Sequence, residues 1–201
     1  MVAQRDDKLS LEDFLALDRE SLDRKYEYMN GHIYALAGGS SNHVIISVNA
    51  TQIISNHLDE QSSPCITYNS DMTLKINDAC FLPDLMVSCN EKDIEENKKY
   101  IECPRLVIEV LSPSTMKRDR YDKLFYYTNN PSIQEYALIS QDKIVVEIYR
   151  RTDLKWEYCA YMEGDTVEFK SIGLIFPIEK LYRRAIVTER NEMGNLSARH
   201  R

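Results

Sequence analysis

The sequence predicts an α/β or α+β domain in which a mixed central β-sheet is flanked by helices. Short runs rich in β-branched and aromatic residues, bounded by turn signals, recur along the chain, and two longer segments place apolar residues at helical spacing. With 201 residues, 43% hydrophobic and 28% charged, the chain is long enough to bury a sizeable core. We expect one domain over residues 1–201, with a core from about 10 to 182 and a flexible tail from about 188 to 201.

The N-terminal third predicts a short helix, a hairpin and a long helix. Ser10 is followed by a helical apolar pattern and takes the N-cap position of the short helix. An Asn-Gly dipeptide between two alternating runs, 26–29 and 32–35, is typical of a type I′ hairpin turn. From 41 to 58, apolar residues recur at roughly helical spacing and predict the long helix.

The rest of the chain predicts mainly strands, interrupted by one further helix. That helix runs from about Lys117 to Asn129 and ends before an Asn-Pro pair, because the residue before proline disfavours the α conformation. The expected strands lie at about 64–68, 71–77, 82–89, 104–111, 134–140, 143–150 and 154–161. Sheet edges in such a plan can present side chains to one cleft.

Two of these strands each carry a carboxylate where a buried strand normally has another hydrophobic residue. Asp84 lies in the run Leu82–Val87, and Glu109 is the only charge in Leu106–Leu111, whose two faces are both apolar and therefore predict a central strand. A carboxylate removed from water loses several kcal/mol of solvation, so it persists when it is paired with a cation. A divalent metal is the strongest such partner.

Both carboxylates also have structural explanations. Glu109 can form a buried ion pair with an arginine or lysine, and Asp84 follows a proline, where aspartate commonly forms turns. Asp71, in a Ser-Asp-Met segment, is better explained as a turn residue than as a ligand. These alternatives stay open from the sequence.

A lysine and three further titratable residues extend the candidate site. Asp119 and Lys123 lie four residues apart on the predicted helix. They can form a surface ion pair worth ~0.2–0.5 kcal/mol. Alternatively, the lysine can stabilise negative charge that develops on a phosphate. His43, near the start of the long helix, and Glu27, in the hairpin, can face the same cleft or be structural.

The net charge of −7 and the pI near 5.2 limit how this chain can bind nucleic acid. A protein that relies on broad phosphate contact is usually basic on at least one face, so binding here must come from local patches or not at all. Each candidate patch can equally be a solvated face. The patches are Lys117-Arg118 with Arg120 and Lys123, then Arg150-Arg151, then Arg183-Arg184.

Cysteine usage and apolar runs suggest the compartment. Five cysteines, odd in number and without a CxxC pair, indicate neither a disulfide framework nor a zinc site, so we expect buried thiols. No apolar run approaches the ~20 residues of a membrane span, and the first residues lack the apolar core of a signal peptide. We therefore expect a cytoplasmic protein without membrane association.

Several motifs together resemble a known family. They are Pro83-Asp84, the run from Pro104 to Thr115, Asp119 with Lys123 and Tyr127, and Glu135-Tyr136. In these residues the chain resembles the Uma-two family of bacterial endonucleases, within the PD-(D/E)XK restriction-endonuclease-like superfamily. The resemblance runs from about Ser10 to about Tyr182, and Glu27, Gly31 and His43 also match it.

The resemblance implies a restriction-endonuclease-like fold, with an N-terminal helix and hairpin beside the mixed sheet. It implies Mg²⁺ held by Asp84 and Glu109, with Mn²⁺ able to substitute, and hydrolysis of a phosphodiester bond. The superfamily's lysine stands two residues after the glutamate, but that position here is Leu111, so its role has to move to Lys123. Ala137 and Ser140 also replace a tryptophan and an aspartate that the family often carries, which alters a packing face.

The sequence thus predicts a divalent-metal-dependent nuclease that acts on nucleic acid, with DNA expected. Asp84, Glu109, Lys123 and Glu27 form the expected catalytic set, and His43 is expected to contact substrate. The alternatives are a binding or assembly module that retains the fold, and a hydrolase of small phosphoesters. The strand at 144–149 suggests either pairing at a sheet edge or burial of a face against a second copy, and a twofold homodimer suits cleavage of both strands of a duplex.

Overall fold

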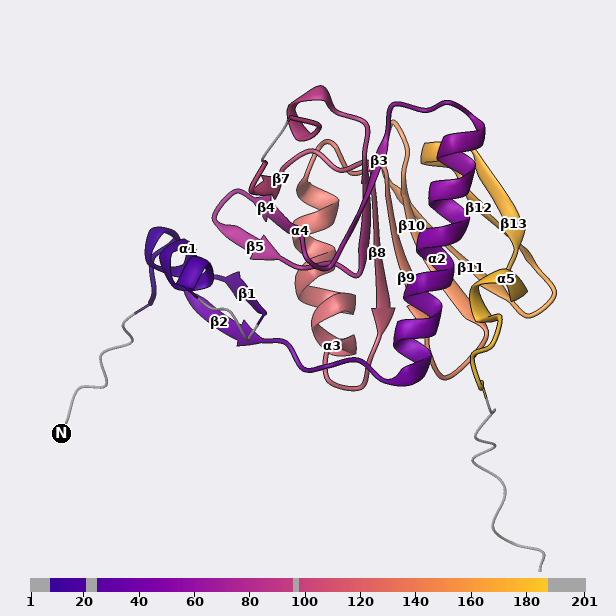
Figure 1. Ribbon diagram of the computed structural model, residues 1–201, viewed down its shortest axis with the longest axis horizontal. Coiled ribbons are helices and arrows are strands. Elements are labelled where there is room, and N and C mark those ends of the chain that lie inside the picture. Colours follow the sequence, from indigo (N-terminus) through magenta and orange to yellow (C-terminus); the bar gives the residue numbers. More distant parts are fainter. Residues whose placement is uncertain (1–7, 21–24, 96–97, 188–201) are drawn as a thin grey trace, which may run out of the picture.

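The computed structural model describes residues 8–20, 25–95 and 98–187 (Figure 1). The predicted tail at 188–201 lies outside these residues. In the described part no helix is long and apolar enough to cross a membrane. The helices are α1 (Leu11–Glu20), α2 (Ser41–Glu60), α3 (Met116–Arg118), α4 (Leu124–Asn129) and α5 (Glu179–Tyr182). Two 3₁₀ turns, Glu91–Asp93 and Lys170–Ile172, and a π-helical segment, Asp119–Lys123, complete the helical elements of this part.

A six-stranded mixed sheet forms the centre of the molecule, in the order β11-β10-β9-β8-β6-β3. Its strands are β3 (Ile66–Asn69), β6 (Leu85–Ser88), β8 (Leu106–Leu111), β9 (Glu135–Ser140), β10 (Val145–Arg151) and β11 (Trp156–Met162). β8 runs parallel to β9, and the other neighbouring pairs are antiparallel. The expected mixed sheet is therefore confirmed.

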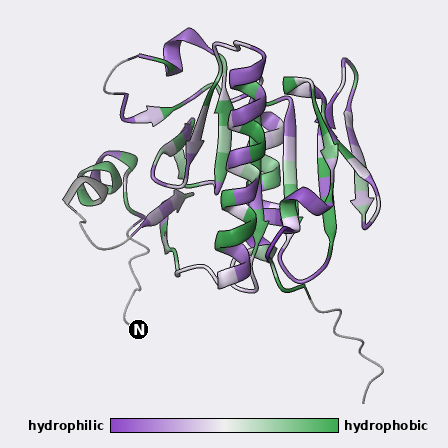
Figure 2. Cartoon of the chain, turned by 45° about the vertical axis from the view of Figure 1, so that its right-hand side comes forward, coloured by the Kyte–Doolittle hydropathy of each residue, from purple (hydrophilic) through white to green (hydrophobic). Residues whose placement is uncertain are grey.

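Helices cover both faces of this sheet. Ile46, Ala50 and Ile54 of α2 pack on one face, which continues into the hairpin of β12 (Thr166–Phe169) and β13 (Leu174–Pro177) and into α5. Tyr127 of α4 packs on the other face. Figure 2 shows hydrophobic and hydrophilic bands alternating along α2, as expected when one face of a helix meets a sheet. All six residues of β8 are buried, so its predicted central position is confirmed.

A second, smaller sheet lies beside the central one, in the order β2-β1-β5-β4-β7 (Figure 1). It contains β1 (Tyr26–Met29), β2 (His32–Ala35), β4 (Thr73–Ile76), β5 (Ala79–Phe81) and β7 (Tyr100–Ile101). The turn residues Asn30 and Gly31 both have positive φ, 52° and 86°, which confirms the type I′ hairpin.

The predicted strand at 82–89 is shorter than expected, and a strand precedes it. β5 ends at Phe81 in the small sheet and β6 begins at Leu85 in the central sheet, so the chain crosses between the two sheets at 82–84. Pro83 cannot donate to either ladder, which suits this crossing. Asp84 therefore lies at the junction of the sheets rather than inside a strand.

Two further expectations are wrong. The segment expected to pair at a sheet edge with a second copy forms β10, which lies between β9 and β11, and the edges of the sheet are β11 and β3. Cys65 and Cys89 form a disulfide, where only thiols were expected. They flank the antiparallel pair Ile66 and Ser88, so strand register brings them face to face, which cysteine count and spacing cannot reveal.

Candidate active site

A cavity of about 630 Å³ opens between α2, the start of β6, the end of β8 and the π-helical segment. All five residues predicted for the site line it: Glu27, His43, Asp84, Glu109 and Lys123. They come from elements spread over about a hundred residues of sequence, from β1 to the π-helical segment. The fold therefore assembles the predicted set in one place.

Lys123 lies at the centre of the charged residues. Its Nζ lies 2.7 Å from Glu27 Oε1, 2.8 Å from Glu109 Oε1 and 3.2 Å from Asp119 Oδ1. Lys123 is 2% exposed and Asp119 is 1% exposed. The interpretation of these two residues as a solvated surface pair is therefore wrong.

The helix that carries the two residues is confirmed in extent but not in regularity. It runs from Met116 to Asn129 and contains the π-helical segment Asp119–Lys123. Such segments are rare in helices and are often found at functional sites. Both Asp119 and Lys123, at the two ends of this widened turn, are buried at the sheet.

Glu109 brings the end of β8 into the cluster. Its Oε1 accepts hydrogen bonds from Lys123 Nζ at 2.8 Å and from the Tyr127 hydroxyl at 3.1 Å. Burial raises the pKa of Glu109 well above its ordinary value, Lys123 opposes that change, and Asp119, Asp84 and Glu27 add to it. Burial alone would lower the pKa of Lys123. The carboxylates of Glu109, Glu27 and Asp119 outweigh this effect and raise its pKa well above the ordinary value.

Glu27 is fully buried and holds three donors. Its Oε1 accepts from the Leu82 amide at 3.1 Å and from Lys123, and its Oε2 accepts from Arg118 Nη1 at 3.1 Å. The Arg118 guanidinium also lies 4.2 Å from the centre of the Tyr34 ring. Arg118 thus joins the hairpin to the helix. Sequence reasoning placed it in a surface patch, because nothing local to it indicates a partner 91 residues away.

Asp84 and His43 form the outer part of the site. Asp84 Oδ2 accepts a hydrogen bond from the Val110 amide at 2.7 Å and lies 3.2 Å from His43 Nε2. The hydrogen bond to Asp84 raises the pKa of His43, against the opposing effect of burial. A Cβ at Gly39 would lie 2.8 Å from His43 Nδ1, so the chain needs glycine there to leave room for the imidazole.

The cluster carries more negative than positive charge. Four carboxylates, of Glu27, Asp84, Glu109 and Asp119, face two permanent cations, Lys123 and Arg118. Within the described residues no hydrogen bond reaches Glu109 Oε2 or Asp84 Oδ1, and the cation beside the buried Asp119 Oδ1 is Lys123, at 3.2 Å. An added cation would balance this charge.

The donor set fits one class of metal better than another. The described residues contain no group of three or more His, Cys, Asp or Glu side chains that could hold a metal ion. Mg²⁺ is usually bound through one or two carboxylates, with water and substrate oxygens completing its shell. Asp84 and Glu109, each with one oxygen that lacks a hydrogen bond, match that requirement.

Comparison with known proteins identifies the family. Residues 11–178 match the model of the Uma2 family, described as "Putative restriction endonuclease". The chain belongs to the Uma2 family. It is 39% identical to an uncharacterized protein of Synechocystis sp. over 88% of this chain and 92% of that protein. A second uncharacterized Synechocystis protein is 29% identical over 75% of this chain and 86% of that protein.

A solved structure agrees with the Uma2 assignment at the level of the fold. A crystal structure described as a putative nuclease from Anabaena variabilis superimposes with a TM-score of 0.71 at 20% identity, covering 87% of this chain and 98% of that chain. The restriction-endonuclease-like fold expected from the sequence is thus confirmed.

Two of the three predicted basic patches in this Uma2 chain are used internally. Arg120 forms a bidentate ion pair with Glu147, Arg150 pairs with Glu135 at 2.7 Å, and Arg151 donates to backbone carbonyl groups. The patch at Arg183-Arg184 remains exposed. Among the described residues, no carboxylate pairs with Arg183 or Arg184, and Lys117 of the first patch is also exposed.

Proposed function

We propose that this Uma2 chain is a divalent-metal-dependent nuclease that hydrolyses phosphodiester bonds of DNA. The observation that carries the proposal is the convergence of three carboxylates, of Glu27, Glu109 and Asp119, on one buried lysine at the wall of an open cavity that Asp84 also lines. A purely structural ion cluster needs neither the excess negative charge nor the opening. The family description as a restriction endonuclease supports the same chemistry.

In this proposal Asp84 and Glu109 hold Mg²⁺, or Mn²⁺ in its place. When bound, the ion supplies a water of lowered pKa and neutralises charge on the phosphate. The water oxygen forms a bond to phosphorus while one phosphorus–oxygen ester bond breaks. The water proton passes to solvent, and the leaving alkoxide takes up a proton from solvent.

The other residues of the cavity have distinct parts. Lys123 stays protonated between its three carboxylates, so its ammonium stabilises negative charge that develops on the phosphate. Glu27 and Asp119 position that ammonium. His43, held by Asp84 in the first turn of α2, donates to a substrate oxygen, and the N-terminal end of α2 adds its partial positive charge there.

The test is a cleavage assay on mixed DNA and RNA substrates with Mg²⁺, with Mn²⁺ and with chelator. We expect DNA to be cut with either metal and to stay intact with chelator. Metal-independent binding without cleavage would instead support a binding or assembly module that retains the fold. Cleavage of small phosphoesters but not of polymers would support the third alternative.

A homodimer is a further part of the proposal, because cleavage of both strands of a duplex suits twofold symmetry. The central sheet has edge strands β11 and β3, and we propose β11 for this pairing. Light scattering at tens of micromolar is expected to give the mass of a dimer. The mass of a monomer would remove this part of the proposal without affecting the chemistry.

A further inference from the structure

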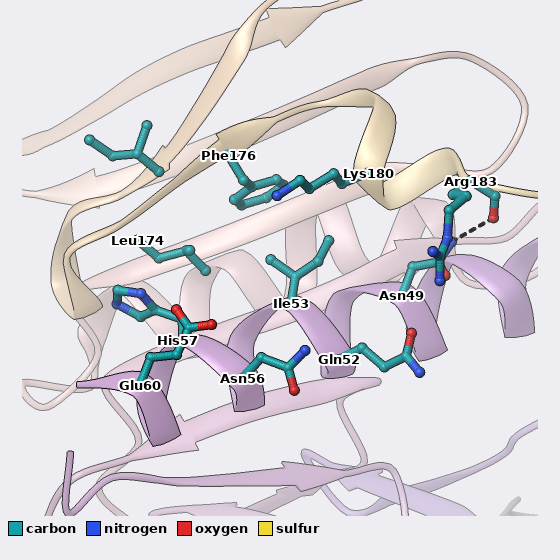
Figure 3. Close-up of a pocket in the computed structure, with 11 residues that line it drawn as sticks. Asn49, Gln52, Ile53, Asn56, His57, Glu60, Leu174, Phe176, Lys180 and Arg183 are labelled. Carbon is teal, nitrogen blue, oxygen red and sulfur yellow. Dashed lines mark hydrogen bonds between the residues drawn. The ribbon is translucent and has the colours of Figure 1, made fainter. Parts of the chain in front are cut away.

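A second concave surface lies on the opposite flank of α2 from the candidate active site. Val44, Ser47 and Val48 line the active-site cavity, whereas Asn49, Gln52 and Asn56 line a groove of about 540 Å³ against β13 and α5. Figure 3 shows this groove, with the amide side chains on α2 below and Phe176, Lys180 and Arg183 above. One helix therefore forms a wall of both cavities.

The groove has a cationic end and an acidic end. Lys180 and Arg183 lie near Asn49 and Gln52, and Glu60 and His57 lie at the other end (Figure 3). His57 Nε2 is already hydrogen-bonded to the carbonyl oxygen of Ile172 at 2.9 Å. The free donors therefore gather at the end toward the N-terminus of α2.

The cationic residues are exposed and are not used by the fold. Within the described part of the chain, no carboxylate pairs with Lys180, Arg183 or Arg184, in contrast to Arg118, Arg120 and Arg150. Gln52 and Asn56 are also exposed, one helical turn apart, and add amide donors beside them. In a protein of net charge −7, an unpaired group of this kind is a local exception.

The segment that carries the arginines is fixed to α2 at both ends. Asn49 Nδ2 donates to the carbonyl oxygens of Leu181 and Arg183, each at 2.8 Å. Asn42 makes two hydrogen bonds with the backbone of Ile186. Its Nδ2 donates to the Ile186 carbonyl oxygen at 2.8 Å, and its Oδ1 accepts from the Ile186 amide at 3.0 Å. The segment from Arg183 to Ile186 thus runs along α2 toward its first turn.

Backbone geometry at Arg184 also indicates that this segment is held in a fixed conformation. Its φ is 70°, in the left-handed region that glycine and asparagine adopt most readily. An arginine costs energy at such a position, and the two asparagine clamps hold it there. The segment ends beside Asn42, whose neighbour His43 contacts Asp84 of the active site.

We infer that this surface binds the phosphodiester backbone of duplex DNA and leads it across α2 into the active site. We call it the α2–α5 groove, lined by Gln52, Asn56, Lys180 and Arg183 and followed in the chain by the exposed Arg184. Phe176 is only 3% exposed, so the groove offers no aromatic face for stacking an unpaired base. Lysine, arginine and amide side chains are groups that donate hydrogen bonds to phosphate oxygens. This inference rests on the proposed nuclease function for the identity of the bound polymer.

The test is binding of a DNA duplex of about 20 base pairs, measured over a range of salt concentrations in the presence of EDTA so that no cleavage occurs. The variant carries Lys180→Gln, Arg183→Gln and Arg184→Gln. The control removes the same charge from exposed lysines on other surfaces, with Lys92→Gln, Lys155→Gln and Lys170→Gln.

Each phosphate contact contributes about 0.9 to the slope of log K against log salt concentration. We expect the groove variant to lower that slope by about 2 to 3 and the affinity on the order of tenfold or more, with the control unchanged. Equal slopes for wild type, variant and control would overturn the inference, as would a wild type that does not bind the duplex.

A second pair of variants tests the groove without the arginines. Gln52→Glu places a negative charge in the groove at unchanged size, and Gln61→Glu does so at the exposed end of α2, outside the groove. We expect the first to weaken duplex binding several-fold and the second to leave it unchanged. Equal effects of the two substitutions would contradict the assigned path.

Cleavage by the groove variant separates this inference from the proposed function. At saturating duplex with Mn²⁺, we expect its turnover to equal that of wild type, because none of the three residues lines the active-site cavity. A wild type that binds with the expected slope but never cuts would remove the proposed function and leave the groove in place. Normal cleavage by wild type, together with an unchanged salt slope in the groove variant, would overturn the inference about the groove and leave the proposed function in place.

Discussion

Two adjacent parallel strands each bury one glutamate, and the two glutamates differ in almost everything else. Glu135 of β9 is 1% exposed, and both of its oxygens are hydrogen-bonded. Arg150 Nε donates at 2.7 Å, and the amides of Lys170 and Ser171 donate at 3.1 and 2.8 Å. Glu109 of β8 is 4% exposed, but it shares its cation with two other carboxylates and has one oxygen without a hydrogen bond.

The different surroundings of Glu135 and Glu109 show that burial of a carboxylate does not by itself indicate function. Glu135 is neutralised by its own arginine and ties β9 to β10 and to the turn at 170–172, as a structural anchor does. Asp93 is similar, since it is 1% exposed and accepts from Ser88 Oγ and from the amides of Glu102 and Cys103. Excess charge and incomplete hydrogen bonding separate Glu109 from both.

The largest expected effect is on cleavage by Glu109→Gln. The amide keeps the volume of the side chain but removes the hard anionic ligand, so we expect Mg²⁺-dependent cleavage to be abolished while the fold persists. Circular dichroism combined with the DNA cleavage assay measures both. Full activity in a correctly folded variant would end the assignment of Glu109 as a ligand.

Lys123→Met is expected to act on both rate and stability. It leaves three buried carboxylates without their shared cation, so we expect a loss of about 3 kcal/mol in the free energy of unfolding without metal. We expect cleavage to slow on the order of a hundredfold, because the ammonium no longer stabilises the transition state. Urea denaturation and single-turnover cleavage at saturating Mn²⁺ measure the two effects.

The surface pair Lys155 and Glu157 provides the control for that substitution. Lys155→Met is expected to change the free energy of unfolding by no more than a few tenths of a kcal/mol, because both side chains are more than half exposed. A wild-type cleavage rate for Lys123→Met would leave the site without its cation and would favour the binding module.

Glu135→Gln tests whether the second buried glutamate contributes to stability alone. It weakens the bond to Arg150, so we expect a loss of about 2 to 3 kcal/mol in stability. Cleavage per folded molecule is expected to match wild type, because Glu135 does not line the active-site cavity. Loss of cleavage in a fraction shown to be folded would mean that the two glutamates are not separate in function.

The smallest expected effect is the change in melting temperature on adding metal. An ion that binds only the folded state stabilises it by mass action, roughly 5 to 10 °C at about 100 times its Kd for a protein of this size. We expect this rise in wild type and in Glu135→Gln and its absence in Glu109→Gln. Calorimetry with Mg²⁺, Mn²⁺ and EDTA gives all three values, and an equal rise in Glu109→Gln would place the ion elsewhere.

Local pattern was sufficient for several features. The Asn-Gly dipeptide predicts the hairpin, and two apolar faces predict the central position of β8. These features depend on residues within a few positions of one another. The five candidate site residues could therefore be named from the sequence.

Most of what the sequence did not predict depends on distant partners. The pairing of β5 with β1, the pairing of β7 with β4 and the disulfide between Cys65 and Cys89 join segments that are more distant in the chain. The same holds for Arg118, whose basic neighbours suggest a surface patch while its actual partner is Glu27 on β1. The hairpin β12–β13 is local and was not predicted.

The sequence alone identifies the chemically unusual residues, which are carboxylates in apolar strands, a lysine one turn from an aspartate, and an arginine pair at 183–184. The contacts that each of these residues makes are seen only in the folded structure. Glu135 and Glu109 look alike in sequence, each the only charge of an apolar strand, and they differ because one meets a dedicated arginine and the other shares a lysine. Net charge and hydrogen bonding around a buried group are sums over neighbours in space, and the fold sets those neighbours.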